Sequence, residues 1–182
     1  MIDFLLLMKQ ELIITVIIFT LLLLKIGTEM SNTAILNLAN GLLLFNLAAG
    51  FMGNQAGMLF DGMFFTNPLI VLQKNILSLG TLIVSLQSSS WLKKHEHVPE
   101  FYILLLSNLL GMFFMISTGN LLMFYVGLEL SSIPLAAMAN FDLGKRKSSE
   151  AAMKFIVSSV FCIGLIIVWY FVGIWRNRHT YF

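Results

Sequence analysis

Six long runs of apolar residues, separated by short polar segments, dominate this chain of 182 residues. Crossing the roughly 30 Å hydrocarbon core of a bilayer takes about 20 helical residues, and each run is close to that length. Charged residues make up 11% of the chain, whereas a soluble domain carries about 25%. We therefore predict a single transmembrane domain over residues 1–182, an all-α polytopic membrane helix bundle. The predicted helices span residues 11–26, 34–52, 68–86, 100–118, 120–140 and 149–174.

Basic residues are unevenly distributed among the connections. The connections after the first, third and fifth runs hold Lys25, Lys93, Lys94, Lys145, Arg146 and Lys147, whereas those after the second and fourth hold no Lys or Arg. Because cytoplasmic loops carry the excess of Lys and Arg, we expect the odd-numbered connections in the cytoplasm and the N-terminus outside.

One carboxylate, Glu129, lies near the middle of the fifth run. A charge at the bilayer centre costs roughly 2.5–3.5 kcal/mol on insertion scales. Protonating a carboxylate of ordinary pKa costs about 3.7 kcal/mol at neutral pH. Because the two costs are close, a nearby charge can tip Glu129 between its ionised and neutral forms, as a proton relay requires. The structural alternative is a carboxylate that is paired for helix packing.

The neighbours of Glu129 on an ideal helix are also polar. Residues three and four apart share a face, so Tyr125 and Ser132 form a polar stripe with Glu129, which should face protein or water. Pro134 leaves the carbonyl of Leu130 without its helical donor. This predicts either a kink just past Glu129 or an ordinary membrane-helix proline.

The sixth run begins with two further charges, Glu150 and Lys154. Ser148 is expected to cap the helix, and Glu150 suits the positive end of the helix dipole. Lys154 does not suit that end, but it lies four residues after Glu150, where the two side chains can pair. Two interpretations stay open for Lys154: a snorkelling side chain at the interface, or a second proton-carrying station.

Lys74 in the third run is a third intramembrane charge, flanked by Gln73 and Asn75. It is expected either to snorkel toward the interface or to line a polar interior, where it would support the proton-carrying residues.

Several classes of function are disfavoured. The single cysteine, Cys162, excludes an internal disulfide framework and a multi-cysteine metal site. A net charge of +2, without a basic stripe, argues against nucleic acid as a partner. The sequence shows no nucleotide-binding loop, hydrolase serine motif or haem-attachment motif. We expect the chain itself to bind no cofactor or metal and to carry protons or ions within the lipid bilayer, or to support subunits that do.

Three segments together resemble a known family. They are residues 99–106 (Pro-Glu-Phe-Tyr-Ile-Leu-Leu-Leu), 120–135 (which contains Gly-Leu-Glu-Leu-Ser-Ser-Ile-Pro-Leu) and 145–155 (which contains Ser-Glu-Ala-Ala-Met-Lys-Phe). In their order and spacing they resemble subunit N of proton-pumping NADH-quinone oxidoreductase, respiratory complex I. Residues 1–98 match more loosely, through hydropathy and Asp61-Gly62.

The resemblance implies a role in an inner membrane. Subunit N is an antiporter-like proton channel of the membrane arm, and its partners are the other membrane-arm subunits. Glu129 matches the family's key glutamate of the fifth helix, and Lys154 matches a lysine of the sixth. NADH, quinone, FMN and Fe-S clusters are implied for the parent complex, so this chain would meet quinone only indirectly.

The sequence departs from the family in two ways. Family members have about fourteen helices, including later lysines that are absent here, so we expect an N-terminal fragment. The family usually continues with a Gly-rich loop after the sixth helix, whereas here the sequence continues Trp-Arg-Asn-Arg-His-Thr-Tyr-Phe over residues 175–182. One hypothesis is a frameshift within residues 160–182, because one choice of codons for this tail, read one base later, encodes such a loop.

Two alternative functions stay open. A cation/proton antiporter subunit shares the same ancestry and the same buried Glu and Lys. A non-functional remnant or a small structural membrane protein would show no loss of pumping when Glu129 is replaced.

Overall fold

The computed structural model of the chain describes residues 6–27, 31–52, 56–95, 97–142 and 144–179. Within these residues, six helices are long and apolar enough to cross a membrane, which confirms the predicted membrane helix bundle. They are α2 (Lys9–Gly27), α3 (Asn32–Phe51), α4 (Pro68–Leu92), α5 (Val98–Ile116), α6 (Leu121–Ala139) and α7 (Arg146–His179). The chain forms two compact units, a first unit of Met1–Met138 and a second unit of Ala139–Phe182.

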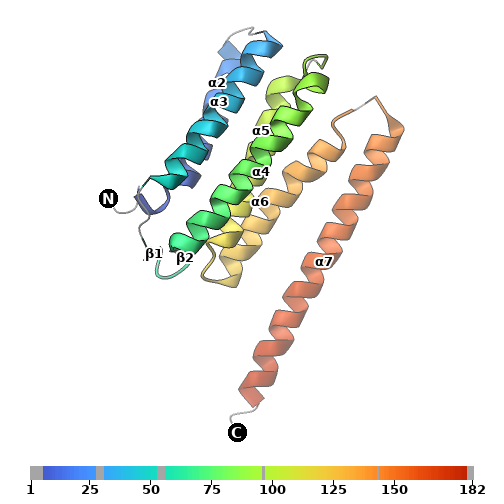
Figure 1. The fold of residues 1–182 in the computed structure, drawn as a ribbon. Coiled ribbons are helices and arrows are strands. Elements are labelled where there is room, and N and C mark those ends of the chain that lie inside the picture. The colour runs from blue at the N-terminus through green and yellow to red at the C-terminus, as the bar shows by residue number, and fades with distance from the viewer. Residues whose placement is uncertain (1–5, 28–30, 53–55, 96, 143, 180–182) are drawn as a thin grey trace. The chain divides into compact units, whose positions relative to one another are not determined.

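The core of the first unit is a bundle of α2, α3, α4 and α5 (Figure 1). Helix α2 packs against α3 and α5, and α4 packs against the same two helices. Fully buried Ile14, Leu36, Leu43, Leu106 and Leu109 fill the space between them. The four helices thus enclose an interior of their own, and polar residues in that interior are shielded from lipid.

Side chains that accept hydrogen bonds from the first turn fix where several helices begin. Asn67 Oδ1 accepts from the Ile70 amide at 2.7 Å, and Pro68 follows as the first residue of α4. Asn120 Oδ1 accepts from the Met123 amide at 2.9 Å at the start of α6. Asn is a favoured N-cap residue, and Pro suits the first turn.

Helix α4 extends to Leu92, beyond the predicted end at residue 86. Hydropathy falls in this last part, which is why the sequence indicated an earlier end. The hydroxyls of Ser88 and Ser89 donate to the carbonyls of Val84 and Leu86, at 2.6 and 2.7 Å. These bonds satisfy the polar side chains within the helix, so the helix continues through a polar stretch.

A short antiparallel hairpin, which was not predicted, precedes α4. Strand β1 (Gly57–Leu59) pairs with β2 (Phe64–Thr66), and Met58 lies opposite Phe65. The turn between the strands places Asp61 and Gly62 at positive φ. The hairpin is bonded to the segment after α5: the Phe65 amide donates to Ser117 O at 2.8 Å, and the Gly119 amide donates to Met63 O at 2.7 Å.

The connections of the first unit gather at two ends. At one end, Lys25 Nζ pairs with Glu100 Oε1 at 2.6 Å, and Asn32 Nδ2 donates to His95 O at 2.9 Å. At the other end, Lys9 donates to Met52 O near the hairpin. The first and third connections therefore lie at the same end of the bundle, and the side of the membrane that this end faces stays a prediction.

In the second unit, α7 begins at Arg146, not at residue 149. The prediction that Ser148 is the N-cap is wrong, because Ser148 already lies inside the helix. Its hydroxyl donates instead to Ala139 O at 2.8 Å, and Ser149 Oγ donates to Asn140 Oδ1 at 3.0 Å. The helix continues to His179, and residues 180–182 of the predicted frameshifted tail lie outside the described residues.

Candidate functional site

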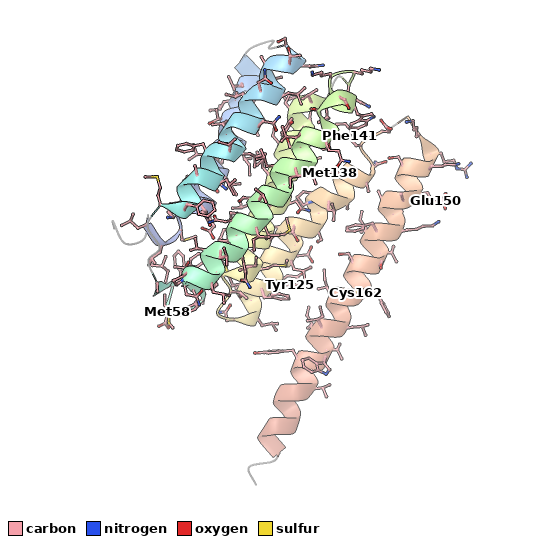
Figure 2. All side chains as sticks on the ribbon, in the orientation of Figure 1. Met58, Tyr125, Met138, Phe141, Glu150 and Cys162 are labelled. Atoms are coloured by element: carbon pink, nitrogen blue, oxygen red, sulfur yellow. The ribbon has the colours of Figure 1, made fainter. Side chains whose placement is uncertain are left out.

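Glu129 lies midway along α6 and is half-buried. Tyr125 lies one turn earlier on α6 (Figure 2), close enough to interact electrostatically with Glu129. Tyr125 is 41% exposed. The predicted polar stripe is therefore partly exposed.

The third member of the stripe, Ser132, contacts the backbone of α6. Ser132 Oγ lies 3.5 Å from Glu129 O, at the limit of a hydrogen bond, so it contacts the carbonyl and not the carboxylate. Pro134 is buried, and α6 continues through it to Ala139. A kink at Pro134 stays a prediction.

Two glycines let α6 approach α5 closely beside Glu129. A Cβ added to Gly127 would lie 2.8 Å from the Met115 amide nitrogen and 3.0 Å from Gly111 O. One turn later, Asn108 Nδ2 of α5 donates to Ser131 O of α6 at 3.1 Å. Small residues at a helix crossing let backbones come into contact in membranes, and here they hold the Glu129 segment against α5.

Glu150 and Lys154 form the pair that their spacing predicted. Lys154 Nζ lies 2.6 Å from Glu150 Oε1 on α7 (Figure 2). The side chains are 60% and 75% exposed in the described residues. Because Lys154 belongs to the second unit and Glu129 to the first, the structure shows each with its own neighbours only.

Lys74 does not snorkel. Its Nζ lies 2.5 Å from Glu11 Oε1 of α2, and each side chain is only 2% exposed. The ammonium also lies 5.1 Å from the centre of the Phe64 ring and 5.9 Å from that of Phe113, within the range of a cation–π attraction. Of the two expectations for Lys74, a place in a polar interior is confirmed.

A second buried pair lies beside the first. Gln10 Nε2 donates to Asn75 Oδ1 at 2.6 Å, between the same two helices. Gly50 of α3 leaves the space for this pair, because a Cβ there would collide with both side chains. Sequence reasoning named Asn75 only as a neighbour of Lys74, and it did not identify Gln10 or Glu11 as site residues.

A signal for Glu11 was nevertheless present in the sequence. A buried Lys requires an acidic partner, and the sequence offers few carboxylates within its apolar runs. Glu11 stands at the edge of the first run, where it was treated only as a helix boundary. The pairing of residues so far apart in the chain follows from the packing of α2 near α4.

The comparisons with known proteins agree with the motifs around Glu129. Residues 117–177 match the family described as NADH:quinone oxidoreductase/Mrp antiporter, TM. Over these residues the chain is similar to this transmembrane family. Curated relatives are named NADH-quinone oxidoreductase subunit N. The protein of Phocaeicola vulgatus is 46% identical over 60% of this chain and 24% of its own length. That of Pelagibacter ubique is 35% identical over 86% of this chain and 34% of its own length.

The family match covers the predicted proton-carrying residues but not the buried Glu11–Lys74 pair. Glu129 and Lys154 both fall inside the matched segment, whereas Glu11 and Lys74 lie before it. The chain spans only about a quarter to a third of the length of the curated relatives it matches. The family match therefore supports a multi-pass membrane protein of the antiporter-like type, and it assigns no role to the buried pair.

Proposed function

We propose that the chain contributes to a proton-translocating membrane subunit of an NADH-quinone oxidoreductase, with Glu129 as a proton carrier. The observation that carries the proposal is a single half-buried carboxylate, midway along a membrane helix, inside the segment that matches the family. The relatives' names support membership of an oxidoreductase complex. In this function, redox energy elsewhere in the complex drives protons across the membrane.

The surroundings of Glu129 suit reversible protonation. Tyr125, one turn away, gives the carboxylate a polar neighbour on a largely apolar helix. The close approach of α5 at Gly127 fixes the backbone on which Glu129 stands. A carboxylate that is partly shielded, with one polar neighbour, changes charge when a nearby charge changes. Lys74 is the proposed source of such charge within the unit that holds Glu129, and Lys154 is proposed as a second proton carrier in the other unit.

The remaining parts of the proposed function concern the whole complex. The membrane is the inner membrane, the end of the bundle that holds Lys25 and Glu100 faces the cytoplasm, and other membrane-arm subunits are the partners. NADH, FMN, Fe-S clusters and quinone belong to those other subunits. NADH and quinone come from the relatives' names, the orientation comes from the positive-inside rule, and the other statements come from the resemblance to respiratory complex I.

The test is proton pumping by the assembled complex in inverted membrane vesicles, with NADH as donor. We expect Glu129→Gln to abolish most of the pumping, because an amide cannot exchange a proton, and Glu129→Asp to retain part of it. Glu100→Gln is the matched control, since Glu100 lies at a bundle end beside Lys25. Normal pumping by an assembled Glu129→Gln complex would refute the proposal.

A second candidate function is cation/proton antiport, which the family description itself includes. It predicts proton movement driven by an imposed sodium gradient in the absence of NADH. Vesicles that show sodium-driven, Glu129-dependent proton exchange without any NADH-driven pumping would favour this candidate.

A further inference from the structure

We infer that Glu11 and Lys74 form a proton-binding site inside the α2–α5 bundle, separate from Glu129. The site would take up one proton on Glu11 Oε2, next to a bound water. The two side chains are 2% exposed, and they meet at 2.5 Å between helices α2 and α4. The inference does not depend on the proposed function, because it concerns residues outside the segment that matches the family.

The first observation is an unused oxygen. Glu11 Oε1 accepts from Lys74 Nζ, whereas Glu11 Oε2 is buried and accepts no hydrogen bond from any described residue. A buried acceptor without a partner is costly, and such a group usually holds water or a proton. Oε2 is therefore the atom of the pair at which a proton can be added.

The second observation is a small cavity at the same place. It has a volume of about 10 Å³ and is lined by Leu6, Leu7, Lys9, Gln10, Glu11, Thr66, Val71 and Lys74. A water molecule needs a cavity of roughly 10–15 Å³ and two to four polar partners. Thr66, Gln10 and the charged pair supply such partners, so the cavity suits one water beside the carboxylate.

The third observation is a continuous polar face on α4. This α4 polar face consists of the buried residues Lys74, Asn75, Ser78, Thr81 and Ser85. It extends about 16 Å along the helix at 1.5 Å per residue, roughly half of the hydrocarbon thickness. An ionisable residue inside a membrane usually marks a proton or ion pathway, and Lys74 begins this row of polar residues.

Partners from two neighbouring helices line the α4 polar face. Asn46 Nδ2 of α3 donates to Ser78 Oγ at 3.3 Å. Ser85 Oγ donates to Tyr102 OH of α5 at 2.9 Å, and it also bonds with Asn40 of α3. Asn46 Oδ1 is buried and accepts no hydrogen bond from the described residues. The face thus contains a second unsatisfied acceptor, where a further water would fit the chemistry.

Few other ionisable groups face the site. Phe64 of β2 and Phe113 of α5 present rings to Lys74, and Lys9 lines the cavity. The sequence of α3 has no ionisable side chain. On α5, Glu100 is at the opposite bundle end, beside Lys25. On the side of the hairpin, Asp61 is exposed in the turn.

The proton balance of the site is simple. In the resting pair, the negative charge of the Glu11 carboxylate and the positive charge of the Lys74 ammonium cancel. Uptake of a proton from water converts the Glu11 carboxylate into a carboxylic acid, with its O–H on Oε2, and leaves the Lys74 ammonium unchanged. The pair then carries one unpaired positive charge in a buried place, which is unfavourable, and the Phe64 and Phe113 rings and the bound water offset part of that cost. Release of the proton to water restores the neutral pair.

The test is infrared difference spectroscopy of the full chain in lipid bilayers, switched between alkaline and acidic buffer. We expect a carbonyl band of a newly formed carboxylic acid that is lost in Glu11→Gln. The band should persist, shifted in position, in Glu11→Asp, which keeps a proton-binding group and decides the matter if Glu11→Gln does not fold. Glu100→Gln is the control: it removes the separate contribution of Glu100 and should leave the Glu11 band unchanged.

The outcomes separate this site from Glu129. A band that is lost in Glu129→Gln but unchanged in Glu11→Gln and Glu11→Asp would overturn the inference and leave the proposed function intact. A band that is lost in Glu11→Gln supports the inference, even if pumping by the complex proves independent of Glu129.

Discussion

Removing one member of the Glu11–Lys74 pair should destabilise the first unit strongly, and removing both should not. The pair is almost wholly enclosed, with 2% exposure on each side and 2.5 Å between Lys74 Nζ and Glu11 Oε1. At an effective dielectric constant near 20, two unit charges at this distance attract by about 6–7 kcal/mol. Desolvation offsets much of this attraction, since it costs several kcal/mol per ion.

The expected magnitudes follow from this near balance. Lys74→Met and Glu11→Gln each leave one buried charge unpaired, and breaking a buried pair in this way costs about 3–5 kcal/mol. The double variant removes both charges and should be close to the wild type, because replacing a whole buried pair is often neutral. The total stability of a domain is about 5–15 kcal/mol, so either single change should be plain in an unfolding curve.

The assay is reversible unfolding of the chain in detergent micelles, followed by circular dichroism, as a double-mutant cycle. We expect a coupling energy of about 3 kcal/mol or more, far above the ~0.5 kcal/mol that independent sites show. The cost of Lys74→Met should grow from acidic to alkaline buffer, because a proton can neutralise the lone Glu11 only at low pH. Single variants that each cost less than about 1 kcal/mol and simply add would refute the buried pair.

Three further predictions concern the helices themselves. Gly127→Ala should lower stability by about 1–3 kcal/mol, because its Cβ would press on α5; Gly80→Ala, where a Cβ meets nothing within 4 Å, should be neutral or stabilising in the same unfolding assay. Asn67→Ala should cost about 1 kcal/mol through loss of the α4 cap, whereas no change would show that the cap is not formed. Lys154→Gln should change stability by no more than about 0.5 kcal/mol, because its pair with Glu150 is exposed; a larger loss in thermal unfolding would mean that other contacts hold Lys154.

The positions of the helices were predictable because hydropathy is a local property. All six predicted spans overlap an observed helix, and the largest difference among the helix ends of the first unit is at the end of α4. There the serines bond to helical carbonyls, which a hydropathy scale does not register. The hairpin escaped prediction because its two strands are only three residues each.

The site was predictable in part. The spacing of Glu150 and Lys154 predicted their pair, since both lie on one helix. The proximity of Tyr125 to Glu129 followed from the same rule. Helical spacing could not predict the partner of Lys74, because Glu11 lies 63 residues away in the sequence and is brought close only by helix packing. Local periodicity gives neighbours along one helix, whereas pairs between helices require the fold.

The hydrogen bonds between the hairpin and the end of α5 have a mechanical consequence for Glu129. Phe65 and Met63 hold the backbone at Ser117 and Gly119, immediately before α6 begins. These bonds fix the first end of α6, so the helix, about 28 Å long at 1.5 Å per residue, can tilt only about that end. Glu129 lies near the midpoint of α6. Any swing of α6 about its anchored end would carry the carboxylate about half as far as Ala139.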